Sequence, residues 1–452
     1  MLALSPLFLA ATLAIDGEVA LRHASQLSAL GPHPIGSPRS RFAAEYVAAQ
    51  FRQAGLQEVR LQEALSKDLR GANVLGVLRS PGPELIVIAA HHDSVQDSPG
   101  AYGSSAGVGV LIETARVLAR QGDRPRTIVF ASFDGREPAL GNRGGLGARA
   151  YVQSLGREAR QVVGVLVLDR AGRKAVPTVL ETTAYPDPLR PGAVLVAPAF
   201  LVRVTVEGAT AAGESLAAGD PSWSWLYQAG ARTFRLTDAG DERPFLEAGL
   251  PALRLSGRRF LAADPHDQKP TDTADKLDVD ALAQTGRVVL GGLAALENAA
   301  RPSGPEPDWF LRFGQVASHG ALLAAGALSL LPGLLLAARA SRLHLALRLV
   351  HAVLFGLLLY VQPVLAVFAF FLWNVVTAFG LRLWRLALGA LPTAALLVFG
   401  GLAWSRGAAS GVLPALWELV LAVLAAALVL ASGQRRAGRS RLGGGRKGLP
   451  KH

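Results

Sequence analysis

The sequence contains no cysteine, and charged residues make up only 18% of its 452 residues. The absence of cysteine excludes disulfide bonds and thiolate metal sites, and it gives no information on the compartment. Apolar residues make up 50% of the chain. A chain of this length is too long for a single compact core, since one domain usually takes about 100–200 residues. We therefore expect more than one structural region.

Acidic residues are almost absent from the last third of the chain. Beyond Trp309 the only one is Glu418, although the whole sequence contains 34 Asp and Glu residues. A long stretch without carboxylates that is rich in Leu, Ala, Val and Phe is typical of helices that face lipid. The sequence therefore predicts a globular domain over 16–300, a proline-rich linker over 301–317 and a transmembrane bundle over 318–431.

The bundle is predicted to contain about five helices, because a helix needs about 20 residues to cross a bilayer. The apolar stretch 345–383 is nearly twice that length, and Gln362 and Pro363 interrupt it, which indicates a hairpin of two helices. The other three helices are predicted at 318–338, 387–404 and 412–431. Five helices place most loop arginines in the cytoplasm and the large domain outside.

Basic residues outnumber acidic ones and give a formal net charge of +12. Much of the excess lies in the tail 432–452, directly after an apolar helix, where basic residues usually mark a cytoplasmic flank. We therefore expect membrane lipid as a partner and no nucleic acid. At the other end, 1–15 is apolar and lacks preceding basic residues. We interpret it as a signal or anchor segment, with a buried first helix as the alternative.

The region 16–300 alternates short apolar runs with helical patterns. Its first part, 16–63, is predicted to be helix, loop and helix, and 174–231 is interpreted as an irregular insertion. Strands are predicted at 73–79, 85–90, 127–133, 162–168 and 251–255, and further helices at 106–120, 147–155 and 279–299. This alternation predicts an α/β fold with a mostly parallel sheet flanked by helices.

Seven motifs follow one another between about Leu21 and Leu293. They are GPHPIGS, LIVIAAHHDSV, PGAYGSSAGVGVLIETARVL, RTIVFASFDGREPALGNRGGLGARAYV, VLVLDRAG, DERPFLEAGLPALRLSG and PTDTADKLD. In order and spacing they resemble the zinc aminopeptidase family that includes the endoplasmic-reticulum metallopeptidases, glutamate carboxypeptidase and the catalytically inert transferrin receptor. The resemblance implies a zinc exopeptidase-like fold, and the following membrane bundle most resembles the endoplasmic-reticulum type.

The resemblance also implies two zinc ions bridged by one carboxylate, with a glutamate as general base on a shared water. His91, in an H-x-D pattern, matches the histidine ligand of the first zinc, and Asp93 matches the carboxylate that orients it. Glu137 matches a ligand of the second zinc, and Asp169 matches the remaining carboxylate ligand of the first. Asp241, in a D-x-x-P-F segment, matches an aspartate with a structural or substrate-facing role.

Three positions depart from the family pattern. The bridging aspartate falls on Gly103, and the general base falls on Arg136, whose guanidinium stays protonated and cannot accept a proton. Arg136 is able to pair with Glu137 or Asp169 instead and so to fill the space of a zinc ion. The last histidine ligand falls on Gln268, with His266 as a substitute if the loop bulges.

These losses favour a catalytically impaired homologue that binds a peptide or protein ligand or acts as a scaffold. The alternative is an active metalloexopeptidase that removes amino-terminal residues, with one zinc held by His91, Asp169 and His266. In that case Glu137 or Asp93 would serve as the base. A transporter or assembly factor is a third interpretation, which the scarcity of polar residues in the predicted spans disfavours.

Overall fold

The computed structural model describes residues 15–138, 144–174, 178–181, 194–218, 240–257 and 264–300, with the short segments 185–186, 188, 302, 309–310 and 316–317. The chain divides into two units, 1–316 and 317–452. The predicted transmembrane bundle and basic tail lie outside the described residues, as does the predicted signal or anchor segment except for Ile15.

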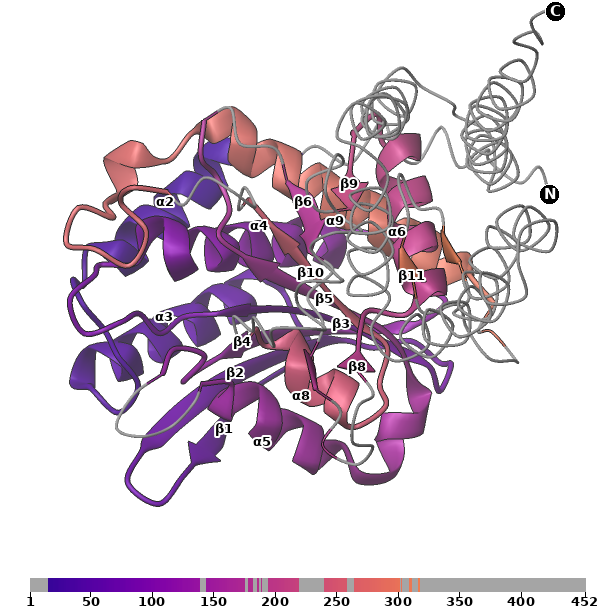
Figure 1. Ribbon diagram of the computed structural model, residues 1–452, viewed down its shortest axis with the longest axis horizontal. Helices are drawn as coiled ribbons and strands as arrows, with labels where there is room; N and C mark the ends of the chain where they lie inside the picture. Colours follow the sequence, from indigo (N-terminus) through magenta and orange to yellow (C-terminus); the bar gives the residue numbers. More distant parts are fainter. Residues whose placement is uncertain are drawn as a thin grey trace, which may run out of the picture. The chain divides into compact units, whose positions relative to one another are not determined.

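A mixed sheet forms the centre of the first unit, with the strand order β1-β2-β4-β3-β5-β10-β6-β9 (Figure 1). Its strands are β1 (Glu58–Leu65), β2 (Arg70–Leu78), β3 (Leu85–His91), β4 (Thr127–Phe133), β5 (Val162–Asp169), β6 (Val179–Glu181), β9 (Ala217–Ala218) and β10 (Ala252–Ser256). Strands β4, β3, β5 and β10 run parallel, whereas β1, β2 and β6 pair antiparallel with their neighbours in this core. The predicted parallel sheet is therefore found at the centre, and the edges are mixed.

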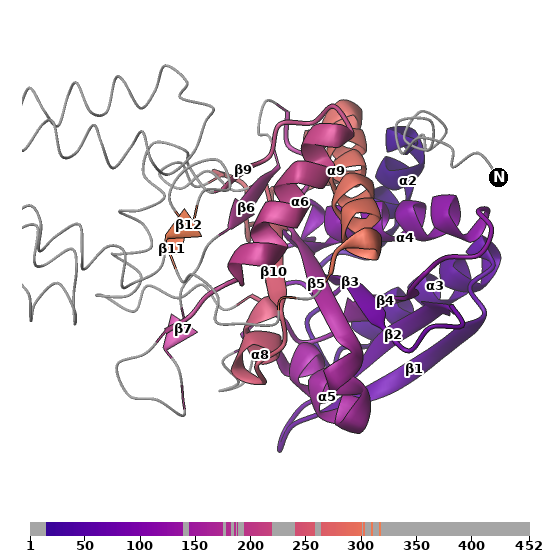
Figure 2. The same ribbon diagram turned by 90° about the vertical axis from the view of Figure 1, so that its right-hand side faces the viewer.

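Helices cover both faces of the sheet (Figure 2). One face packs against α2 (Gly17–Ser28), α3 (Pro38–Ala54), α4 (Ala106–Ala119), α6 (Ala199–Ala211) and α9 (Val279–Asn298), and the other against α5 (Leu146–Leu155) and α8 (Glu242–Glu247). Short elements complete the described part: a π-helix η1 (Ala101–Ser105), the 3-10 helices η2 (Gly156–Gln161) and η3 (Ala274–Lys276), and the strand pairs β7 (Tyr185–Pro186) with β8 (Val194–Leu195) and β11 (Trp309–Phe310) with β12 (Val316–Ala317).

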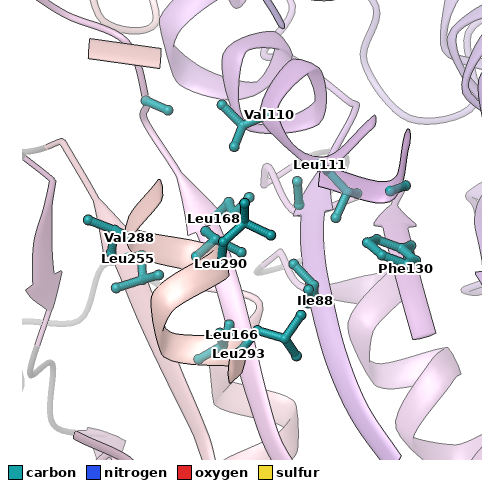
Figure 3. Packing of buried hydrophobic residues seen from close by; sticks show 14 of the residues in the cluster. Ile88, Val110, Leu111, Phe130, Leu166, Leu168, Leu255, Val288, Leu290 and Leu293 are labelled. Atoms are coloured by element: carbon teal, nitrogen blue, oxygen red, sulfur yellow. The ribbon is translucent and has the colours of Figure 1, made fainter. Parts of the chain in front are cut away.

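Successive side chains of a strand point to opposite faces of the sheet, so the apolar central strands contribute to a hydrophobic cluster on each face. In β3, Ile86 and Ile88 belong to the cluster on the α4 and α9 side, whereas Val87 and Ala89 belong to the cluster on the α5 and α8 side. Figure 3 shows Ile88 among the side chains that α4 and α9 pack against the sheet. Strands that are buried on both faces are mostly apolar, which explains why their positions were predictable from sequence.

The last helix of the unit is fixed to the start of a central strand. Arg126, which directly precedes β4, donates hydrogen bonds to the carbonyl oxygens of Leu296 and Ala299. Within the described residues α9 is the one helix that is long and apolar enough to cross a membrane. Most of its apolar stretch is buried in the domain, as in a core helix.

Two sequence predictions were wrong. The segment 58–65 was expected to continue a helical region but forms the edge strand β1. It alternates polar and apolar residues, as a strand with one exposed face does. The segment 174–231 was interpreted as irregular but contains α6, whose residues Phe200, Leu201 and Val202 are buried. The other strands and helices predicted within 16–300 are confirmed within a few residues.

Candidate active site

The candidate site lies where the parallel strands end. Strand β3 ends at His91 and β5 ends at Asp169, and the chain leaving β4 carries Arg136 and Glu137. Because the carboxyl ends of parallel strands meet at one edge of a sheet, these side chains come together there. The register pairs His91 with Phe133, so that β3 and β4 end side by side.

His91 is buried and is hydrogen-bonded through both ring nitrogens. Its Nε2 donates to the carbonyl oxygen of Gly103 at 3.0 Å, and its Nδ1 lies 3.1 Å from the carbonyl oxygen and 3.3 Å from Oδ1 of Asp93. Burial lowers the pKa of His91, but the carboxylates of Asp169 and Asp93 outweigh it and raise the pKa to about 10. The two carboxylates thus favour the protonated ring, and both ring nitrogens face oxygen atoms.

Asp93 ties this histidine to the segment after β4. Its two carboxylate oxygens accept hydrogen bonds from the backbone N–H groups of Arg136, at 3.0 Å, and Glu137, at 2.9 Å. Burial alone would raise the pKa of Asp93, but the bonds to His91 and to the Glu137 N–H lower it below its usual value. Asp93 thus orients His91 and also places Arg136 and Glu137.

The guanidinium of Arg136 lies between the two carboxylates that the resemblance assigns to metal. It donates to Oε1 of Glu137 at 2.7 Å and to Oδ2 of Asp169 at 3.0 Å. Its side chain is only 2% exposed, so that both pairs are shielded from water. The position that should supply a general base therefore supplies a buried positive charge.

Asp169 is held by two further arginines. Its Oδ2 also accepts from Arg170 at 2.8 Å and from Arg254 at 3.1 Å. Burial would raise the pKa of Asp169, but the charges of Arg136 and Arg170 hold it well below its usual range. Asp169 is therefore ionised, and its charge is compensated by guanidinium groups.

Gly103 leaves the expected bridging position without a ligand. It lies in η1, where its N–H donates to Oδ2 of Asp272 at 3.1 Å. A Cβ atom at this position would lie 3.4 Å from Oδ1 of Asp267 and 3.6 Å from Oδ2 of Asp272, which are ordinary contact distances. The backbone therefore does not require glycine here, and a small side chain would fit.

The segment after β10 brings Gln268 to the site and not His266. The Nε2 group of Gln268 donates to Oε2 of Glu137 at 3.0 Å. The Nδ1 atom of His266 instead lies 2.9 Å from the hydroxyl of Thr271. Among the residues that the structure describes, His266 makes no hydrogen bond or ion pair with Asp169 or His91. The gap-free alignment therefore identifies the residue that faces the site, and this residue is an amide.

Asp241 is buried beside the site, at 1% exposure. Neither of its carboxylate oxygens has a hydrogen-bond partner within the described part of the chain. Burial raises the pKa of Asp241 to about 7, although the charges of His91 and Arg136 act in the opposite direction. The missing partners agree with a position that faces the site and not the packed core.

Sequence reasoning missed the two further arginines that bond Asp169, Arg170 and Arg254. Arg254 lies in the middle of an otherwise apolar strand and is 1% exposed. A charged residue inside a central strand is almost always paired, so its presence could have indicated a buried carboxylate partner. Arg170 and Arg173 follow β5 directly and carried no comparable signal.

The residues present do not fit a pair of zinc ions. Over the described ranges, no group of three or more His, Asp or Glu side chains is arranged to hold a metal ion. Both nitrogens of His91 are engaged, and the carboxylates of Glu137 and Asp169 are paired with Arg136. A bridging carboxylate is needed to offset the repulsion between two divalent cations, and Gly103 supplies none.

Comparisons with known proteins agree with this fold. Residues 73–292 match the profile of Peptidase family M28. A probable zinc metalloprotease of Leptosphaeria maculans is 27% identical over 325 residues, which are 62% of this chain and 71% of that protein. Aminopeptidase YwaD of Bacillus subtilis is 26% identical over 237 residues, 49% of this chain and 44% of that protein. The chain thus spans less than half the length of the second relative.

Two solved structures have a similar fold. LapB from Legionella pneumophila has a TM-score of 0.52 at 20% identity and covers 65% of this chain and 76% of its own. Glutaminyl cyclase from Porphyromonas gingivalis has a TM-score of 0.50 at 19% identity and covers 62% of this chain and 98% of its own. The first unit therefore shares its fold with these two proteins. Its residues 73–292 are similar to Peptidase family M28 and to an aminopeptidase.

Proposed function

We propose that this chain is a membrane-anchored relative of the zinc aminopeptidases whose catalytic site is impaired and which serves in binding or as a scaffold. The observation that carries the proposal is the guanidinium of Arg136, which bonds both Glu137 and Asp169. Zinc is the cofactor expected from the relatives, yet the two carboxylates that would bind it are paired with this side chain.

Loss of hydrolysis follows from two separate changes. A guanidinium cannot take a proton from water at ordinary pH, so Arg136 cannot act as the general base. Its positive charge also opposes any cation placed next to it, and this repulsion is strong in a buried site. Gly103 removes the carboxylate that would bridge two ions. A single loss is compatible with reduced activity, whereas the combination removes both metal affinity and proton transfer.

The site retains groups that suit binding. It is a polar, buried arrangement on the rigid edge of a parallel sheet, the part of α/β folds where ligands commonly bind. We propose a peptide or protein ligand, because the relatives are an aminopeptidase and a probable metalloprotease. The membrane anchor rests on the carboxylate-free apolar region after Trp309. The layout suits a tethered exported domain of the endoplasmic-reticulum type.

The zinc content of the purified full chain tests this proposal. After incubation with zinc and removal of the excess, the wild-type protein should retain far less than one equivalent by elemental analysis. The triple variant Gly103→Asp, Arg136→Glu and Gln268→His should bind zinc, because it restores carboxylate and imidazole ligands. The matched variant Gly103→Asn, Arg136→Gln and Gln268→Asn changes side-chain size without adding those ligands, and it should not.

Two equivalents of zinc in the wild-type protein would contradict the proposal. Hydrolysis of aminoacyl-nitroanilides that stops on addition of a chelator would support the one-zinc exopeptidase instead. That alternative needs ligands from His91, Asp169 and His266, whereas Asp169 bonds three arginines and His266 bonds Thr271.

A further inference from the structure

Residues 264–272, here called the strap, lie over the candidate site. The strap is a run of turns in which the N–H groups of Asp267, Lys269 and Asp272 donate to the carbonyl oxygens of the residues three positions earlier. Its Gln268 side chain reaches Glu137, and the Asp272 carboxylate accepts from the N–H of Gly103. The strap therefore contacts Glu137, which follows Arg136, and Gly103, which stands at the expected bridging position.

Arg170 and Arg173, which follow β5, form ion pairs with the strap. Arg170 donates through Nε to Oδ2 of Asp267 at 2.7 Å. Arg173 donates through Nε to Oδ2 of Asp264 at 2.8 Å and through a terminal nitrogen to Oδ1 of Asp272 at 3.2 Å. Both guanidinium groups are buried, with side chains 5% and 6% exposed, whereas Asp264 and Asp267 are partly exposed. The pairs with Asp264 and Asp267 therefore join buried arginines to a more accessible segment, whereas Asp272 is itself buried.

Backbone conformation indicates that contacts, and not local preference, hold this arrangement. Arg170 and Gln268 have φ angles of +49° and +56°, and within the described part they are the non-glycine residues in the left-handed region. This conformation is unfavourable for a side chain with a Cβ atom. Both residues take part in the contacts of the strap, since Arg170 bonds Asp267 and Gln268 bonds Glu137.

Gly103 lets the acidic strap approach. A Cβ atom at residue 103 would meet carboxylate oxygens of Asp267 and Asp272 at van der Waals distance. An aspartate at this position would therefore bring a third carboxylate against two others, and like charges in a buried site repel strongly. A neutral side chain of the same size would not. The charge of residue 103 and the closure of the strap are thus coupled.

We propose that the strap is a closed lid over the site, latched by Arg170 and Arg173, and that a ligand reaches the site only when these ion pairs open. The inference rests on the proposed function, because a metal ligand at position 268 would otherwise tie this segment to the sheet. In this chain, ion pairs between the strap carboxylates and Arg170 and Arg173 take the place of such a metal bond. Local opening of such a segment is an equilibrium that amide exchange reports.

Hydrogen exchange of the full chain in detergent, read by mass spectrometry, tests the latch. Arg173→Gln removes the contacts to Asp264 and Asp272 without touching Asp169. We expect exchange of the strap amides to increase by roughly tenfold, while peptides from β3 and β4 stay unchanged. The matched control is Arg149→Gln, which breaks the 2.7 Å pair with Glu247 far from the strap and should leave strap exchange as in the wild type. Unchanged strap exchange in Arg173→Gln would overturn the proposal.

A second pair of variants decides the matter if Arg173→Gln also loosens β3 and β4. Gly103→Asp and Gly103→Asn add side chains of nearly equal size and differ in charge. Faster strap exchange in the aspartate variant than in the asparagine variant supports the electrostatic latch, and equal exchange refutes it. The two proposals fail separately, because zinc content reports on the Arg136 position and strap exchange reports on Arg173 and Gly103.

Discussion

At the scale of single residues, Arg136 places a buried positive charge between two carboxylates. Its buried guanidinium compensates Glu137 and Asp169, and Asp169 also bonds Arg170 and Arg254. Removal of one partner from a buried ion pair leaves an uncompensated charge in a poorly hydrated site, which costs far more than loss of a pair at the surface.

Arg136→Gln should therefore lower the free energy of unfolding by about 3–5 kcal/mol. The reason is that Glu137 loses its cation and Asp169 loses one of three. Pulse proteolysis of the full chain in increasing urea measures the change. The exposed pair of Arg149 and Glu247 provides the control, since Arg149→Gln should cost no more than about 1 kcal/mol. Equal effects of the two substitutions would show that Arg136 has no special role.

Asp134 gives the domain a pH dependence of its own. Its carboxylate accepts from the Ser40 hydroxyl and the Ala72 N–H, and burial with the nearby charge of Asp93 raises its pKa to about 7. The native carboxyl keeps its proton to a higher pH than the unfolded one. The stability that Asp134 contributes is therefore complete below about pH 4 and is lost as the pH rises to about 7.

Asp134→Asn should remove this loss, because the amide does not ionise and its oxygen still accepts both hydrogen bonds. The stability of the variant relative to the wild type should rise from about pH 4 to about pH 7 and stay constant above it. Urea midpoints measured across this range give the comparison. A difference that is independent of pH would contradict the assignment.

The sequence motifs indicated which residues would come together at the strand ends, with Arg136 as a partner of Glu137 or Asp169, but they did not indicate the other arginines. His91, Asp93, Glu137 and Asp169 fall at strand ends, and their order along the chain is enough to bring them together. The partners Arg170 and Arg173 come from a loop, where no periodicity constrains the side chains. Whether Gln268 or His266 reaches the site depends on one turn, in which Gln268 adopts a left-handed backbone conformation. No pattern in the sequence predicts that conformation.

At the scale of elements, predictability followed burial. Strands β3, β4 and β5 are buried along their whole length, so their apolar runs were plain. The edge strand β1 is largely exposed, and its polar residues concealed it. Helix α6 was missed because it lies in a region without clear boundaries, although it packs closely on α9.

The crossing of α6 and α9 depends on two glycines. A Cβ atom at Gly208 would lie 2.2 Å from the carbonyl oxygen of Gly291, a backbone atom that cannot rotate away. Gly208→Ala should destabilise the domain by about 1–3 kcal/mol, because the helices must move apart. Gly122→Ala is the control, since no atom lies within 4 Å of its added Cβ, and its effect should stay within about 0.5 kcal/mol. Urea unfolding that treats both variants alike would contradict the close crossing.

At the scale of the whole molecule, the proposed topology places the domain outside and the tail inside. The absence of cysteine makes this directly testable, because any introduced thiol is the only one. A membrane-impermeant maleimide applied to intact cells should label a cysteine at Gly122 in the domain and should not label one at Gly444 in the tail. After lysis both should react. Labelling of the tail in intact cells would contradict five spans.

The bond between Arg126 and the end of α9 has a mechanical consequence for the membrane-tethered domain that we propose. A force applied to the chain beyond Ala300 acts first on the hydrogen bonds from Arg126 to the carbonyl oxygens of Leu296 and Ala299. Arg126 directly precedes β4, which is hydrogen-bonded to a strand on each side. The load therefore passes into the middle of the sheet, where many bonds share it, and the terminal helix is protected from being peeled away.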